Sequence, residues 1–90
     1  MKLEEHEKES LEIFGKPYTE IHLWLDEFAG TAEWGRRHHN EGLREAEKLF
    51  GWDAALAARL HIMSDLKEEG WKESDRFPED EADYVRMGLF

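Results

Sequence analysis

Five histidines are spread along this chain of 90 residues, and their spacing could serve metal binding. Four of them fall in four separate segments with a helical pattern, and two are followed one helical turn later by an aspartate. Because residues four apart share one face of a helix, helices packed side by side could point several imidazoles and two carboxylates at one another. These groups are standard ligands for divalent zinc, iron, manganese and nickel. The candidate metal ligands are His6, His22, Asp26, His38, His39, His61 and Asp65.

Small residues one turn away from the histidines favour an inward-facing arrangement. Glycine and alanine flank His39 and His61 at helical spacing, whereas His38 has tryptophan and glutamate as one-turn neighbours. Small side chains let a neighbouring helix approach or leave space for an ion and its water, so we rank His39 above His38. The expected ligands are His22, His39 and His61, with Asp65 as a ligand or hydrogen-bond acceptor, Asp26 orienting His22, and His6 as a lid or fourth ligand.

The competing interpretation is a structural histidine network without a metal. A histidine followed four residues later by aspartate is usually a surface pair of small energetic weight. Alanine is common in helices because it is the best helix former. The protein would then be a helical interaction module without chemistry. Its C-terminal apolar residues could form a homodimer with a second copy, although packing on their own core is the simpler expectation; these residues are Tyr84, Val85, Met87, Leu89 and Phe90.

Glycines mark where the helices should end. Gly15, Gly30, Gly51 and Gly70 each follow a helical pattern, as expected for a residue that closes a helix in the left-handed conformation. The predicted helices span residues 3–14, 19–29, 31–50 and 53–69, followed by a short helix at 79–87 with Pro78 at its first turn. Thr19, Thr31 and Asp53 are placed to cap three of them. We therefore expect an all-α fold, in which four main helices and a short C-terminal helix form one compact domain over residues 1–90.

Apolar stripes predict which helix faces are buried. Ile21, Trp24, Leu25 and Phe28 form one stripe in the second helix. Leu56, Leu60, Met63 and Leu66 form another in the fourth helix. The third helix is less regular, because it contains Gly35 and Gly42, and each interior glycine costs about 1 kcal/mol relative to alanine. Some feature of the fold should offset that cost.

Composition excludes several classes of function. The formal net charge of −10 argues against nucleic-acid binding, which depends on neutralising phosphates. No run of residues approaches the roughly 18 apolar positions that a membrane span needs, so we expect no membrane partner. The chain has no cysteine, which fits a reducing compartment, and we expect a cytoplasmic protein.

Four short motifs, in order, carry a resemblance. They are IHLWLD at residues 21–26, RHH at 37–39 with Glu41-Gly42 close behind, LFG at 49–51, and HIMSDL at 61–66. The chain resembles an uncharacterised family of small helical proteins from bacteria, archaea and phages. In that family a histidine precedes a Phe-Gly pair by about two turns, as His6 precedes Phe14-Gly15 here. The resemblance covers nearly the whole chain except the acidic tail at 71–90, and it implies that the seven candidate ligands belong to one pattern.

A weaker likeness is to the HD phosphohydrolases, helical enzymes with metals held by histidines and aspartates. His22, His39 and Asp65 can be matched to the order of the metal ligands along the chain in that family, and this match would imply a metal-dependent hydrolase. The decisive dipeptide is broken, because Asn40 follows His39 where that family has aspartate. We place this alternative below a simple metal site. An open coordination position would support hydrolysis by an activated water, whereas a closed one would make the ion a structural staple.

Overall fold

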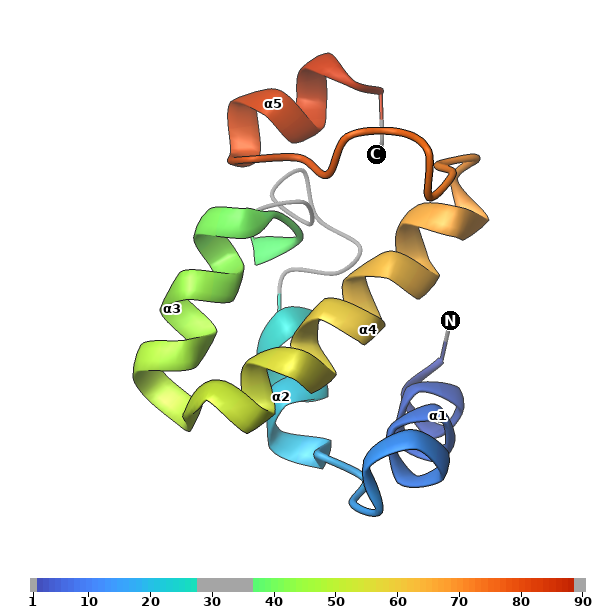
Figure 1. The fold of residues 1–90 in the computed structure, drawn as a ribbon, viewed down its shortest axis with the longest axis vertical. Helices are drawn as coiled ribbons and strands as arrows, with labels where there is room; N and C mark the ends of the chain where they lie inside the picture. The colour runs from blue at the N-terminus through green and yellow to red at the C-terminus, as the bar shows by residue number, and fades with distance from the viewer. Residues whose placement is uncertain (1, 28–36, 89–90) are drawn as a thin grey trace.

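The computed structural model describes residues 2–27 and 37–88, and within these ranges the secondary structure is helical, with no strand. The longest helix, α4, packs against α1, α2 and α3, and the short α5 lies near the start of α3 (Figure 1). The predicted all-α bundle of four main helices and a short C-terminal helix is confirmed. The helices are α1 (Leu3–Phe14), α2 (Thr19–Leu25), α3 (Asn40–Phe50), α4 (Trp52–Glu68) and α5 (Glu81–Arg86).

Gly15, Gly51 and Gly70 each follow a helix with a positive φ, but Gly51, with ψ of 164°, is not in the left-handed helical conformation. The capping predictions that the structure describes are wrong. Gly15 closes α1 in the left-handed region with φ of 78°. Thr19 does not cap α2, which begins after the left-handed Tyr18; its hydroxyl donates to the Glu7 carboxylate instead. Asp53 lies inside the first turn of α4, because that helix begins at Trp52. The predictions for Gly30 and Thr31 lie outside the described residues.

Three predicted helix boundaries need correction. The helix expected at 31–50 begins only at Asn40, because His39 has an extended backbone and caps α3. The helix expected at 19–29 ends at Leu25, and residues 26 and 27 form a turn. The last helix begins at Glu81 and is capped by Asp80, whose carboxylate accepts from the Asp83 N–H at 2.8 Å. Pro78 therefore precedes the cap and does not lie in the first turn.

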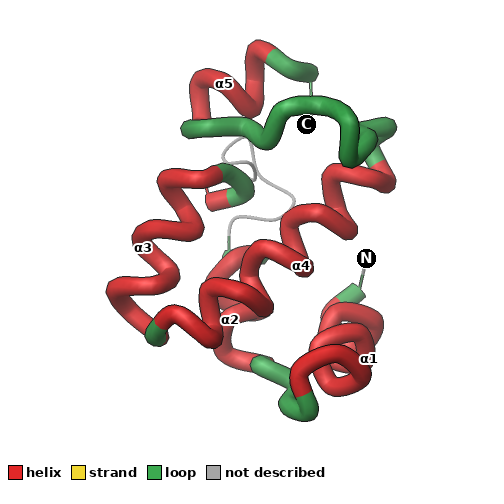
Figure 2. Tube along the Cα trace, in the orientation of Figure 1, coloured by secondary structure: helices red, strands yellow, loops and turns green. Residues whose placement is uncertain are grey.

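The loop between α4 and α5 is anchored on the start of α3 (Figure 2). The N–H groups of Asn40 and Glu41 donate to the carbonyls of residues 78 and 79, both at 2.9 Å. The Gly42 N–H donates to Nδ1 of His39 at 3.0 Å. The first N–H groups of a helix have no partner inside the helix, so these bonds satisfy them and join two segments that are far apart in the sequence. They also hold the residues before α3 in a defined position.

The buried face of α4 differs from the predicted stripe. Leu56 is 44 % exposed, so its assignment to the core is wrong, and Leu60 and Met63 are only partly buried. The buried positions follow the histidine face instead, and they are Ala54, Ala57, Ala58, His61, Ile62, Asp65 and Leu66. Alanine residues let the neighbouring helices approach α4 closely. The hydrophobic core formed around this face consists of Ile21, Leu25, Ala46, Ala57, Ala58, Ile62, Leu66, Trp71 and Tyr84.

The C-terminal apolar residues are divided between core and surface. Tyr84 is buried, and the partly buried Met87 packs on the core, whereas Val85 is exposed. Leu89 and Phe90 lie outside the described residues, so the homodimer stays a prediction. None of the helices described here combines the length and apolar character needed to cross a membrane.

Candidate metal centre

Four imidazoles and two carboxylates from distant parts of the chain meet beside α4. α1 contributes one histidine, α2 one histidine and the aspartate that follows it, the segment before α3 one histidine, and α4 a histidine and an aspartate. The four histidines are 0–1 % exposed. We call this group the His–Asp cluster; its members are His6, His22, Asp26, His38, His61 and Asp65.

Asp65 lies at the middle of the His–Asp cluster. Its Oδ1 is 3.1 Å from Nε2 of His6, and its Oδ2 is 3.2 Å from Nε2 of both His38 and His61. His61 and Asp65 share a face of α4 because they are four residues apart. Three imidazoles from three parts of the chain therefore surround a single buried carboxylate.

Asp26 lies at the edge of the cluster that is open to solvent. Its Oδ1 is 3.1 Å from Nε2 of His61 and 3.6 Å from Nε2 of His38, and its side chain is 27 % exposed. We predicted that Asp26 would orient His22, one turn earlier on the same helix. The structure instead pairs it with His61 on α4 and with His38, because α2 ends at Leu25 and Asp26 turns toward the neighbouring elements.

His22 contacts His61 and a serine. Its Nδ1 is 2.8 Å from Nδ1 of His61, and its Nε2 is 2.9 Å from Oγ of Ser10 on α1. Ser10 is fully buried, and it lies one helical turn after His6 in the sequence. That spacing was the available signal, since a residue one turn from a cluster histidine shares its helix face.

Burial and the two carboxylates oppose one another in setting the charge of the cluster. The pKa of His22 is lowered to about 4, mainly by burial and then by the neighbouring His61 and His6, while a backbone hydrogen bond to Pro17 and the charge of Asp26 act in the other direction. Burial also lowers the pKa of His38, although its hydrogen bond to Asp65 acts in the other direction. Both rings are therefore neutral near pH 7, as metal ligands and hydrogen-bond acceptors must be.

The pKa values of His61 and Asp65 move in the directions expected for an ion pair. Burial alone would lower the pKa of His61, but its hydrogen bonds to Asp26 and Asp65 outweigh burial and raise it. Burial alone would raise the pKa of Asp65, but hydrogen bonds from His38, His6 and His61 bring it well below its ordinary range. Asp65 is therefore ionised at neutral pH and attracts cations.

Gly42 explains how His38 enters the cluster. A Cβ atom at Gly42 would lie 2.1 Å from the carbonyl oxygen of Arg37, so only glycine lets the segment 37–39 pass this close to the first turn of α3. Arg37 fixes the same segment to α2, because its guanidinium donates at 2.7 Å to the Trp24 carbonyl and at 2.7 Å to the Glu27 carboxylate. This close approach is the feature that offsets the cost of a glycine in α3. Gly35 lies outside the described residues.

The ranking of the two adjacent histidines is reversed by the structure. His38 lies within the cluster, whereas His39 caps α3 through Nδ1 and belongs to neither group of converging ligand atoms found among the described residues. The ranking assumed that both residues continue a helix. Because His39 is extended, its side chain turns back to the helix start while the side chain of His38 points to Asp65.

Two sets of donor atoms in the described part of the chain could hold an ion. One set contains His6, His22 and His61, and in each set the atoms lie within 4.8 Å of one another. The other set has two carboxylates and two imidazoles, and all its members except Asp26 are buried; it consists of Asp26, His38, His61 and Asp65.

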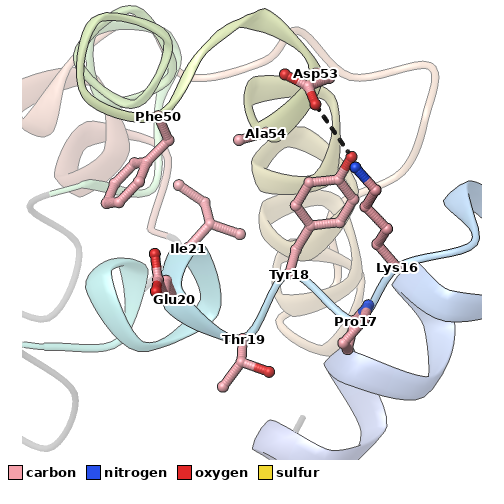
Figure 3. Close-up of a pocket in the computed structure, with 9 residues that line it drawn as sticks. All are labelled: Lys16, Pro17, Tyr18, Thr19, Glu20, Ile21, Phe50, Asp53 and Ala54. Atoms are coloured by element: carbon pink, nitrogen blue, oxygen red, sulfur yellow. Dashed lines mark hydrogen bonds between the residues drawn. The ribbon is translucent and has the colours of Figure 1, made fainter.

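A surface groove of about 420 Å³ lies elsewhere, between the start of α2 and the α3–α4 corner (Figure 3). Ile21, Phe50 and Ala54 give it apolar walls, and the Tyr18 hydroxyl donates to Asp53 at 3.5 Å across one side. None of the cluster residues lines this groove. It is therefore separate from the candidate metal centre.

Comparison with protein-family models, with curated proteins and with solved structures found no match to this chain. The resemblances described from the sequence stay predictions, and the geometry of the cluster is what indicates a function.

Proposed function

We propose that this protein binds one divalent transition-metal ion through Asp26, His38, His61 and Asp65. The observation that carries the proposal is that the ligand atoms of two imidazoles and two carboxylates lie within 4.8 Å of one another. Asp65 is buried and ionised, and burying a carboxylate is costly unless a cation or strong hydrogen bonds compensate it. A divalent ion would add to the compensation that the three imidazoles already give Asp65 and would also balance the charge of Asp26.

Four of the six separations between the donor atoms are close to those of a tetrahedral ion, and all six are within 4.8 Å. Metal bonds of about 2.0–2.1 Å place the ligands of a tetrahedral zinc ion about 3.3–3.4 Å from one another. The atoms Nε2 of His38 and Nε2 of His61 are each 3.2 Å from Asp65 Oδ2, and they are 3.6 Å and 3.1 Å from Asp26 Oδ1. Two nitrogen and two oxygen ligands suit zinc, and iron, manganese or nickel also accept such a set.

A structural role follows from where the four ligands come from. They lie at the end of α2, just before α3 and on α4, so one ion would join three segments that the sequence separates. A chain of this size buries a small core, and metal-binding free energy adds directly to its folding free energy. An ion at a free concentration 100-fold above its Kd would stabilise the fold by about 2.7 kcal/mol. For a domain of this size, that is a rise in Tm of about 10–20 °C.

The test is metal content and melting temperature of protein purified without a histidine tag. We expect one metal per chain, a fall in Tm of about 10–20 °C on chelation, and recovery when zinc is added back. The adjacent histidines offer a matched pair of variants. His38→Ala should lose the metal, whereas His39→Ala should keep it while losing about 1 kcal/mol of stability with the helix cap.

Two results would contradict the proposal. One is a Tm that neither the chelator nor added zinc changes. The other is equal zinc affinity in His38→Ala and His39→Ala. If His38→Ala fails to fold, Asp26→Asn takes its place, because Asp26 is partly exposed and its amide keeps the shape of the side chain while binding metal poorly.

Hydrolysis is the second candidate function, and the exposure of Asp26 is the observation that favours it. From this side water could bind the ion as a fifth ligand or in place of Asp26, and a metal-bound water has a pKa near 7 in catalytic zinc sites. Zinc- and manganese-loaded protein would then hydrolyse a simple phosphodiester such as bis-p-nitrophenyl phosphate. Modest destabilisation by the chelator together with metal-dependent turnover would favour catalysis over the structural role.

A further inference from the structure

Two imidazoles of the His–Asp cluster are not among the four proposed ligands. We infer that His6 and His22 hold the ligands Asp65 and His61 in position and do not bind the ion; this inference rests on the proposed metal site. His6 and His22 are fully buried, so their ring nitrogens depend on partners inside the protein. The contacts of each ring show what it does.

The distance between His22 and His61 is that of a hydrogen bond. Their Nδ1 atoms are 2.8 Å apart, and two ring nitrogens this close share one proton, with one donating and the other accepting. Two ligands of a single tetrahedral ion would be about 3.3 Å apart and would both face the ion with bare lone pairs. The short contact therefore indicates that His22 forms a hydrogen bond with His61 and does not bind the metal.

A metal ion bound to His61 would determine which ring nitrogen carries the proton in His61 and in His22. His61 faces Asp26 and Asp65 with Nε2, so an ion bound there leaves the proton of His61 on Nδ1. That N–H donates to Nδ1 of His22. Because Nδ1 of His22 accepts this proton, His22 carries its own proton on Nε2 and donates it to Oγ of Ser10 at 2.9 Å. Metal-ligating histidines usually donate to a carboxylate or a carbonyl, and here a neutral imidazole backed by a serine takes that place.

His6 acts on Asp65 in the same way. Its Nε2 is 3.1 Å from Oδ1 of Asp65, whereas His38 and His61 contact the other oxygen, Oδ2. Its ring stacks on His61 with centroids 3.6 Å apart and planes 15° apart. Nδ1 of His6 is buried and has no hydrogen-bond partner among the described residues, which is tolerable for a bare lone pair and costly for an N–H. His6 therefore carries its proton on Nε2, donates it to Oδ1, and leaves Oδ2 directed at the ion.

Two serines give a matched test of this arrangement. Ser10 contacts His22, whereas Ser64 joins α4 to α1 by donating to Glu9 at 2.7 Å, outside the cluster. Each serine-to-alanine substitution removes one hydroxyl that bonds between α1 and another helix. Ser10→Ala should weaken zinc binding about 10-fold or more, as measured by competition with a chromophoric chelator, and Ser64→Ala should leave it unchanged.

Nitrogen NMR of the zinc-bound protein supplies a readout that a purely structural role would not move. We expect one zinc per chain, with the ring protons of His6 and His22 on Nε2 and that of His61 on Nδ1. Two zinc ions per chain, direct zinc coordination by either ring, or equal zinc affinity of Ser10→Ala and Ser64→Ala would overturn this inference while leaving the first site in place. Absence of zinc binding by the wild-type protein would overturn both proposals.

Discussion

Replacing Gly42 by alanine tests how the protein places His38. In an ordinary helix this change would stabilise the protein by about 1 kcal/mol, because alanine is the better helix former. Here the new Cβ would lie 2.1 Å from the Arg37 carbonyl oxygen, and ordinary contacts begin near 3.4 Å. The backbone of segment 37–39 must therefore move by about 1 Å, and forcing extra atoms into a packed site costs about 1–3 kcal/mol.

The displacement reaches the metal centre through His38. Its Nε2 is 3.2 Å from Asp65 Oδ2, and a shift of about 1 Å exceeds what a hydrogen bond or a metal bond tolerates. We expect Gly42→Ala to lower the free energy of unfolding by up to about 2 kcal/mol, the net of the two opposing effects, and to weaken zinc binding at least 10-fold.

Urea unfolding of the metal-free protein measures the first effect, and zinc competition measures the second. Glu45→Ala is the control, because Glu45 is an exposed position of the same helix where alanine meets no obstacle. If Gly42→Ala is as stable as Glu45→Ala and binds zinc as tightly as the wild type, the explanation of this glycine is wrong.

Two further predictions concern the rest of the fold. The Asp83 carboxylate accepts from the Arg76 guanidinium and from the Glu79 N–H, and these bonds lower its pKa to about 2. The stabilisation by ionised Asp83 is complete above the pKa of the unfolded state, near 4, and is lost as the pH falls toward 2. The difference in unfolding free energy between the wild type and Asp83→Asn should therefore shrink over that interval. A difference that stays constant would contradict this role of Asp83. Leu66→Ala should cost about 2–5 kcal/mol because Leu66 is fully buried, and Leu56→Gln should change stability by less than about 0.5 kcal/mol; comparable losses in urea unfolding would show that the buried face of α4 is misplaced.

Local physical chemistry made much of this fold predictable. The left-handed conformation at Gly15 and the presence of helices at α1, α2 and α4 depend on residues close in sequence, and the sequence predicted both. The spacing of His61 and Asp65 placed them on one face for the same reason. The prediction that histidines from different helices gather with two aspartates also agrees with the structure, since small residues around His61 indicated a buried face.

Contacts between distant segments decided the rest. The choice of His38 over His39 depends on an extended backbone before α3, which is held by residues 78 and 79 and by the passage of Arg37 across Gly42. The pairing of Asp26 with His61, and of His22 with Ser10, joins different helices. The sequence by itself determined which residues share a helix face, because that follows from the helical repeat. Only the tertiary structure decided which faces meet, because packing sets the position of each helix relative to the others.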